Sequence, residues 1–317
     1  MKSKPVQFFL TGMVTLVIIL MNLGNHSASP DKPIMPRVKT LSTESATPPG
    51  DPGSPAVPDK SGPISQAPWA SDPRFQKAAT DNGTPVQMAA FCTVLRDPLP
   101  GEENNVHLGA DMLAGTVIQP GQIFSQNQTV GPYSSARGFQ EGPVYLGARL
   151  SKTVGGGVCK LASTLYNVAV LSDLPIIERH FHSMPVPYVP YGQDATVCYG
   201  VKDIKFMNNT GQPIMIWAKG IENRLYIGFY GKKPAPQVTW HHDVLKSMPA
   251  PTVKRENPSL PENVQRRILP GMDGAVVRSS VTVRFPGGKE ITRKRGTSWY
   301  APFPEVIEQG TAPTGPE

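Results

Sequence analysis

The residues of this chain best suited to chemistry lie in the segment Gly155-Gly156-Gly157-Val158-Cys159. Glycine lacks a Cβ atom, so a glycine run can adopt positive φ and lets the backbone approach a ligand closely. Apolar residues then recur at three- and four-residue spacing as far as Leu171, which predicts a helix beginning near Cys159. A helix N-terminus carries unpaired N–H groups and a partial positive charge, which lower a thiol pKa and can hold an oxyanion. Cys159 is therefore a candidate nucleophile, and a small buried hydrophobic residue is the alternative interpretation.

A thiol that transfers acyl groups needs a base, and the segment Glu178-Arg179-His180-Phe181-His182 supplies two candidates. If this segment is a strand, His180 and His182 share one face. Asp194 follows beyond a proline-rich turn and could reach back to orient the base. Other interpretations remain open, because Cys159 with the two histidines could bind zinc, or the histidines could be an exposed pair.

Several further residues are candidates for contacting a substrate. Some flank the candidate thiol, some lie in a polar, turn-rich segment, and two tyrosines lie close to Asp194 in the chain. Functional residues concentrate on loops held by a scaffold, although simple loop packing would explain the same pattern. The predicted substrate-binding residues are Gly156, Gly157, Val158, Lys160, Ser125, Asn127, Tyr188 and Tyr191.

The elements that must position these residues mix short strands with a few helices, without regular alternation. This pattern predicts an α+β fold with a mixed sheet and a helix beginning at the glycine-rich turn. The main domain is expected over residues 86–233, with a proline-rich, disordered linker at 30–80 and a second linker at 234–262. A small, separate all-β module is expected over residues 263–312.

The N-terminal residues 1–29 predict export. Lys2 and Lys4 precede an uncharged, mostly apolar run over residues 8–23, which is typical of a signal peptide or a signal anchor. We therefore expect an extracytoplasmic protein of the cell envelope that contacts the membrane through this segment.

The composition bears on partners and on disulfides. The net charge of +7 suits an anionic surrounding such as wall polymer or a membrane surface. Most basic residues are scattered rather than clustered in a stripe, so we expect no nucleic-acid partner. The three cysteines allow at most one pair, and pairing of Cys92 with Cys198 would leave Cys159 free. We expect neither a cofactor nor a bound metal.

Five motifs in order resemble the VanW family, whose name comes from an accessory protein of some vancomycin-resistance clusters. They lie within a match from about Gln87 to Lys232, nearly half of the chain. The tail from Ile268 to Gly310 resembles the small β domain named for its five glycines, which is thought to bind wall sugars. The five motifs are Pro120–Asn127, Thr129–Pro132, Gly155–Cys159, Ser163–Asn167 and Glu178–Ser183.

The resemblance implies a role in the cell wall. Some proteins with a VanW domain are similar in activity to L,D-transpeptidases, which form an acyl-enzyme with a peptidoglycan stem peptide and make 3–3 cross-links. Carried over by motif, Cys159 would be the nucleophile. Lys160 stands where the family usually has glutamine, and Phe181 stands where it often has asparagine. A non-catalytic wall-binding or resistance-accessory protein, with a structural Cys159, is the alternative.

Overall fold

The structure is a computed structural model that describes residues 57–313 except 97, 99, 147 and 148. These residues belong to one compact unit. The predicted export segment at 1–29 lies outside the described residues. Within the described part, no helix combines the length and the apolar character needed to cross a membrane.

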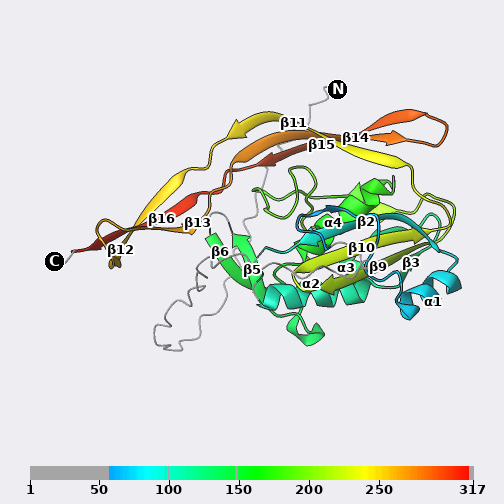
Figure 1. Cartoon of the computed structure of the whole chain (residues 1–317), viewed down its shortest axis with the longest axis horizontal. Helices are drawn as coiled ribbons and strands as arrows, with labels where there is room; N and C mark the ends of the chain where they lie inside the picture. Colours follow the sequence, from blue (N-terminus) through cyan, green and yellow to red (C-terminus); the bar gives the residue numbers. More distant parts are fainter. Residues whose placement is uncertain (1–56, 97, 99, 147–148, 314–317) are drawn as a thin grey trace, which may run out of the picture. The chain divides into compact units, whose positions relative to one another are not determined.

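The main domain is built on a five-stranded sheet in the order β1-β2-β10-β9-β3 (Figure 1). Every neighbouring pair is antiparallel, so this sheet is not mixed as the sequence predicted. The only parallel pair among the described residues joins β12 and β16. The strands are β1 (Gly62–Pro63), β2 (Val86–Val94), β10 (Arg224–Gly231), β9 (Ile214–Ile221) and β3 (Thr116–Ile118).

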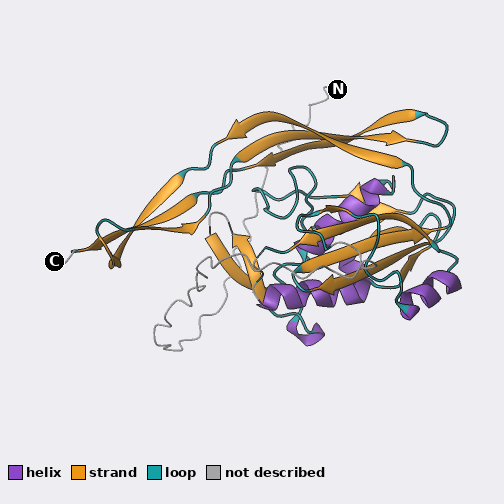
Figure 2. Cartoon of the chain, in the orientation of Figure 1, coloured by secondary structure: helices purple, strands orange, loops and turns teal. Residues whose placement is uncertain are grey.

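Successive side chains of a strand point to opposite faces of the sheet, and both faces of this sheet are apolar. Helices therefore cover both faces (Figure 2). Helices α2 (Pro100–Leu113) and α4 (Cys159–Leu171) share one core cluster with Phe91 of β2. The next residue, Cys92, faces the opposite cluster, which α1 (Pro73–Asp81) covers. The helix predicted at the glycine turn is therefore present and packs on the central sheet.

Two short helices and two smaller sheets complete the main domain. The first sheet joins β4 (Ile123–Ser125), β8 (Lys205–Met207) and β7 (Ile176–Glu178), and the second is a hairpin. The hairpin strands are β5 (Glu141–Leu146) and β6 (Arg149–Val154), and the remaining elements are α3 (Gln126–Thr129) and the 3-10 helix η1 (Ser135–Arg137).

Part of the linker predicted at 30–80 is ordered. Residues 57–80 contain β1 and most of α1, and Trp69 is only 1% exposed. Its indole N–H donates to the hydroxyl of Tyr230 on β10 at 2.8 Å. The prediction was wrong here because one buried aromatic side chain with a hydrogen-bond partner outweighs a proline-rich composition.

The prediction of a second linker at 234–262 is also wrong, because this range holds two long strands. Strand β11 (Gln237–Met248) is an edge of the sheet β11-β14-β15, and β12 (Thr252–Pro261) is an edge of β12-β16-β13. Proline is tolerated on edge strands because one side of such a strand needs no ladder hydrogen bonds. The other strands are β13 (Gln265–Leu269), β14 (Gly274–Arg284), β15 (Glu290–Tyr300) and β16 (Glu305–Ala312).

The β region at 263–312 is not separate from the main domain. Val281 and Val283 of β14 are fully buried in the same core cluster as α4. Trp240 of β11 lies 5.8 Å from the ring of Tyr166 on α4. The second sheet therefore covers the side of α4 that the central sheet leaves open, and one core serves both.

The three cysteines are all free, so the pairing of Cys92 with Cys198 is corrected. Cys92 is completely buried against the aromatic cluster under α1, whereas Cys198 lies in an exposed turn. Burial raises the pKa of Cys92 to about 11, so this thiol stays protonated at neutral pH.

Candidate functional site

The glycine run forms a turn that delivers Cys159 to the first position of α4. Gly155 and Gly157 adopt φ of 81° and 102°, which disfavours any other residue. Gly156 is needed for a different reason, because a Cβ there would lie 2.2 Å from the carbonyl oxygen of Gly142 on β5. Asn105 on α2 donates its side-chain amide to the Gly156 carbonyl at 2.9 Å. No side chain caps this end of α4, and the N–H of Lys160 in its first turn donates to the carbonyl of Gly157 at 2.9 Å.

Replacing Gly156 with alanine is expected to lower the free energy of unfolding by about 1–3 kcal/mol, because the new methyl group has no space against β5. Urea denaturation of the two proteins measures the difference. Gly62→Ala is the matched control, since nothing lies within 4 Å of a Cβ at that position. Equal stability of Gly156→Ala and the wild type would contradict a close approach of the two backbones.

The Cys159 thiol contacts a segment that follows the two histidines. Its Sγ lies 3.3 Å from the Thr196 hydroxyl, and the backbone N–H of Val197 donates to it at 3.5 Å. Burial raises the pKa of Cys159, but hydrogen bonding and charge interaction with His182 lower it further, to about 7. About half of the thiol is therefore ionised at neutral pH.

Two polar residues of α4 hold that segment in place. The Ser163 hydroxyl donates to the carbonyl of Ala195 at 3.1 Å and accepts from its N–H at 2.9 Å. One turn later, the Asn167 amide donates to the carbonyl of Gln193 at 2.8 Å. Residues four apart lie on one face of a helix, so both clamp the same stretch of chain. This clamp places Thr196 beside the thiol.

His182 and Asp194 complete a line of three groups. The imidazole Nδ1 and the backbone N–H of His182 both lie 2.7 Å from Oδ2 of Asp194. Because Asp194 engages Nδ1, Nε2 is the imidazole nitrogen that is left for the Cys159 thiol. Burial lowers the pKa of His182, but its hydrogen bonds with Asp194 and Cys159 raise it to about 9. The arrangement favours a thiolate beside an imidazolium.

The carboxylate of Asp194 is also held by two residues that sequence reasoning did not assign to the site. Its Oδ1 accepts from Nη2 of Arg179 at 2.9 Å and from the hydroxyl of Tyr300 at 2.6 Å. Burial raises the pKa of Asp194, but His182 and Arg179 lower it below its ordinary value. Tyr300 comes from β15, more than a hundred residues later, so no local pattern points to it.

His180 lies apart from the thiol. Strand β7 ends at Glu178, so the two histidines follow it in irregular chain and do not share a strand face as predicted. The imidazole of His180 lies 3.0 Å from Oε1 of Glu178, while its carbonyl accepts from the N–H of Thr196. The backbone N–H of His182 donates to the Asp194 carboxylate rather than to a neighbouring strand. The described residues also hold no group of three His, Cys, Asp or Glu suited to a metal.

Lys160, where the chain departs from the VanW pattern, is turned away from the thiol. Its ammonium forms an ion pair with Glu102 of α2 and lies 4.9 Å from the ring centre of Tyr188. The Tyr188 ring also meets His182 edge-on at 6.4 Å. Tyr188 therefore lines the site, and Lys160 links its ring to Glu102 of α2.

The remaining predicted substrate-binding residues are engaged elsewhere. Ser125 donates to Asp203 at 2.5 Å, and Asn127 donates its side-chain amide to the Lys202 carbonyl at 2.9 Å. Both organise the turn that carries Cys198. Tyr191 donates to the carbonyl of Asp273 at 2.6 Å and so ties the main domain to the β11-β14-β15 sheet.

Comparison with known proteins finds similarity over the part of the chain that carries Cys159, His182 and Asp194. Residues 101–230 match the family model described as VanW like protein. The uncharacterized protein YoaR of Bacillus subtilis (strain 168) is 36% identical over 144 residues, which cover 45% of this chain and 48% of that protein. The vancomycin B-type resistance protein VanW of Enterococcus faecalis (strain ATCC 700802 / V583) is 31% identical over 137 residues, covering 41% and 50%. The chain thus spans about half the length of these curated relatives.

Two solved structures are similar to smaller parts of the chain. The G5 domain of IgA1 protease is 24% identical, with a TM-score of 0.16, over 24% of this chain and 93% of that one. The HP0197-G5 structure is 18% identical, with a TM-score of 0.14, over 23% and 99%. Scores this low leave the five-glycine resemblance of the tail as a prediction from sequence. The family model and the two curated relatives agree, and residues 101–230 of this chain are similar to the VanW family.

Proposed function

We propose that this protein is a cysteine-dependent acyl transferase that acts on peptidoglycan stem peptides in the cell envelope. The observation that supports it is the line of thiol, imidazole and buried carboxylate at the uncapped start of α4. The pKa of Cys159, near 7, and that of His182, near 9, supply a nucleophile and an acid at the same pH.

The reaction would proceed in two halves. The thiolate of Cys159 attacks a peptide carbonyl carbon, a C–S bond forms, and backbone N–H groups at the start of α4 hold the oxyanion. The C–N bond then breaks as the leaving amine takes the proton of the His182 imidazolium. In the second half, the amine of a neighbouring stem attacks the thioester and gives its proton to His182. A new amide forms, and the thiolate is released.

The stem-peptide substrate and the 3–3 cross-link come from the resemblance of the five VanW motifs to L,D-transpeptidase-like proteins. With water as acceptor, the same site would act as a peptidase. The five-glycine resemblance of residues 268–310 supports wall glycan as a second partner, and the apolar N-terminal run supports export. One relative is named a resistance protein, which fits a substrate in the wall.

Incubation of the purified chain with muropeptides tests this function. The wild type is expected to give a cross-linked or trimmed product and a covalent adduct, which mass spectrometry detects. Cys159→Ala is expected to give neither, whereas Cys198→Ala, which removes the exposed thiol, should match the wild type. No product or adduct from the wild type would leave the non-catalytic, wall-binding alternative.

The pH profile of this activity is expected to be bell-shaped. Ionisation of the Cys159 thiol sets the acid limb near pH 7, and loss of the His182 proton sets the basic limb near pH 9. Because the two groups interact, these values belong to the pair. Initial rates at low substrate concentration between pH 5 and about pH 10 give the profile. A rate that keeps rising above pH 9 would rule out His182 as the proton donor.

A further inference from the structure

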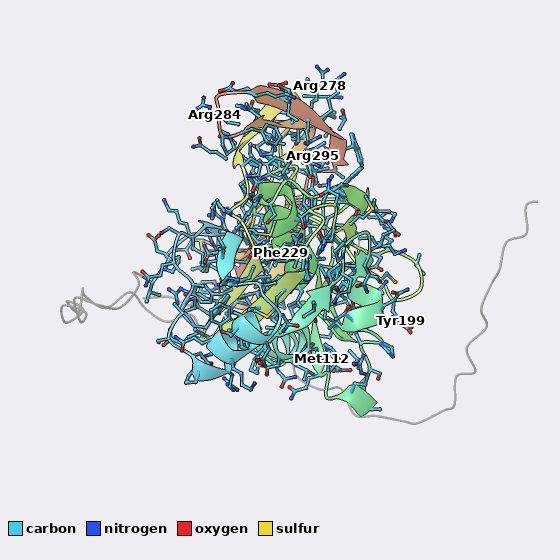
Figure 3. All side chains as sticks on the ribbon, turned by 90° about the vertical axis from the view of Figure 1, so that its right-hand side faces the viewer. Met112, Tyr199, Phe229, Arg278, Arg284 and Arg295 are labelled. Atoms are coloured by element: carbon cyan, nitrogen blue, oxygen red, sulfur yellow. The ribbon has the colours of Figure 1, made fainter. Side chains whose placement is uncertain are left out.

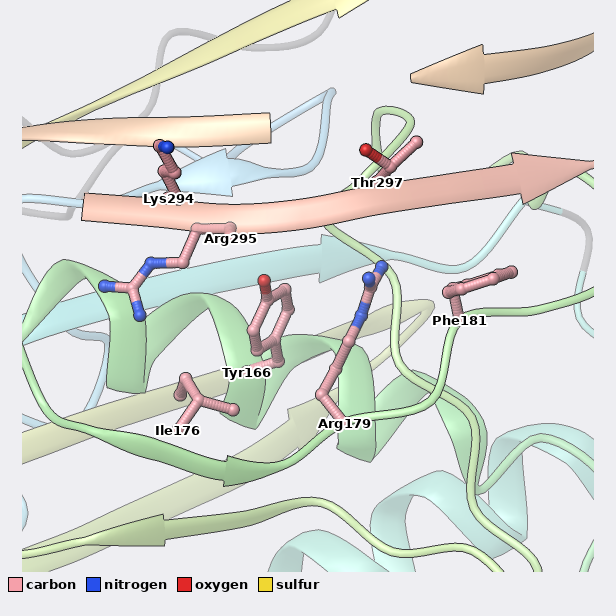
Figure 4. A pocket seen from close by; sticks show the side chains of 7 residues that line it. All are labelled: Tyr166, Ile176, Arg179, Phe181, Lys294, Arg295 and Thr297. Carbon is pink, nitrogen blue, oxygen red and sulfur yellow. The ribbon is translucent and has the colours of Figure 1, made fainter. Parts of the chain in front are cut away.

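A cavity of about 300 Å³ lies between α4 and strand β15 (Figure 4). Tyr166 of α4 forms its floor, while Arg179, Lys294 and Arg295 are three basic residues of its lining. The described lining residues include no carboxylate. Tyr166 follows Cys159 by seven residues, or about 10 Å along the helix, so this cavity lies beside the thiol site and shares Arg179 with it.

Two hydrogen-bond donors of the Arg295 guanidinium lack a partner. Its Nε and Nη2 atoms are buried and have no hydrogen-bond partner. Burial lowers the pKa of Arg295, although a guanidinium stays charged at neutral pH. Loss of hydration destabilises such a cation, and the charge of Asp173, which raises the pKa of Arg295, is already paired with Arg293. The site is therefore incomplete as it stands.

A neighbouring arginine shows what these two atoms bind. Arg293, two residues earlier on the same strand, donates from Nε to Oδ1 of Asp173 at 2.6 Å and from Nη2 to Oδ2 at 3.0 Å. This two-pronged geometry is the usual way in which arginine recognises a carboxylate or a phosphate. Arg295 presents the same two nitrogens with no acceptor.

A bulge in β15 determines where Arg295 points. Ser279 of β14 pairs with Gly296, and Ser280 pairs with Lys294, so Arg295 is the extra residue between them. Gly296 has φ of 92°, a conformation that glycine adopts readily. A bulge redirects side chains and is common beside functional sites. Here it places the guanidinium of Arg295 over α4 beside Tyr166 (Figure 4).

Arg179 adds positive charge to the cavity but offers no hydrogen-bond acceptor to Arg295. Its three nitrogens donate to the Asp194 carbonyl, the Asp194 carboxylate and the Ser298 hydroxyl, and its guanidinium stacks 5.1 Å from the ring centre of Tyr166. Nε and Nη2 of Arg295 are therefore the buried side-chain donors of this described lining that have no hydrogen-bond partner.

We infer that this cavity binds an oxyanion group, a carboxylate or a phosphate carried by a larger ligand, through Nε and Nη2 of Arg295. The inference does not depend on catalysis by Cys159. The two donors, the surrounding positive charge and the space of about 300 Å³ together match such a group.

Titration of the full chain with sodium phosphate, and separately with sodium acetate, tests the site at constant ionic strength set with sodium chloride. The ¹⁵Nε resonance of Arg295 is expected to shift and saturate with at least one of the two anions. The Tm should rise by about 3–5 °C at ten times the dissociation constant. Tighter binding of phosphate points to a phosphate-bearing polymer, and tighter binding of acetate points to a peptide carboxylate.

Arg295→Met is expected to remove the anion-dependent rise in Tm and to match or exceed the wild-type Tm without anion, because the unpaired charge is gone. Arg278→Met, on the exposed side of β14 (Figure 3), should keep the full rise. No saturable shift of the Arg295 resonance with either anion would overturn the inference, as would an equal loss in Arg278→Met. The wild-type titration decides the matter even if Arg295→Met does not fold.

Discussion

Replacing His182 with glutamine is expected to raise the pKa of the Cys159 thiol from about 7 to above its ordinary value of 9.0. Burial alone raises this pKa, and His182 is the largest influence that lowers it, so its loss leaves burial dominant. The fraction of thiolate at pH 7 then falls about 50-fold or more. The rate of alkylation by iodoacetamide, followed from pH 5 to about pH 10, gives the midpoint directly.

This measurement needs two controls. A Cys198→Ser background removes the exposed thiol, while buried Cys92, with its pKa raised to about 11, stays silent at neutral pH. In that background His180→Gln should leave the midpoint near 7, because the imidazole of His180 contacts Glu178. An unchanged midpoint in His182→Gln, or an equal shift in His180→Gln, would show that His182 does not activate the thiol.

Replacing Asp194 with asparagine is expected to lower the free energy of unfolding by about 3–5 kcal/mol. The carboxylate side chain is only 1% exposed and accepts from His182, Arg179 and Tyr300. Asparagine keeps the volume but removes the charge, so the Arg179 guanidinium, 10% exposed, stays buried without a counter-ion. Urea denaturation near pH 7, where Asp194 is ionised, measures the loss.

Asp81→Asn is the matched control, since it makes the same chemical change in an exposed pair with Lys77. That pair is expected to contribute less than about 1 kcal/mol. Tyr300→Phe removes only the hydroxyl that donates to Asp194, and it should lower the free energy of unfolding by about 1.5–3 kcal/mol. If Asp194→Asn costs no more than Asp81→Asn, Asp194 does not balance the charge of Arg179.

The dependence of Asp194 on Tyr300 ties the candidate site to the second sheet. Tyr300 lies at the end of β15, and Arg179 bonds both Asp194 and Ser298 of the same strand. The VanW-like residues 101–230 therefore do not contain every group that orients the imidazole. Damage to the β11-β14-β15 sheet should therefore reach the thiol through Asp194.

The sequence by itself determined the start of α4 and the place of Cys159 within it, because both depend on local features. Positive φ at two glycines and apolar spacing along one helix act over a few residues. The proline-rich composition of 57–80 and 234–262 misled, since burial of Trp69 and a place on sheet edges are decided by distant partners.

Only the tertiary structure decided which histidine meets the thiol. His180 and His182 are equivalent in type and spacing, and Asp194, held by Arg179 and Tyr300, selects the second by taking its N–H and Nδ1. It also decided that Cys92 and Cys198 stay apart and that Arg295 turns inward at a bulge. These outcomes depend on contacts between residues far apart in the chain, which hydrogen bonding and burial select only once the two sheets enclose α4.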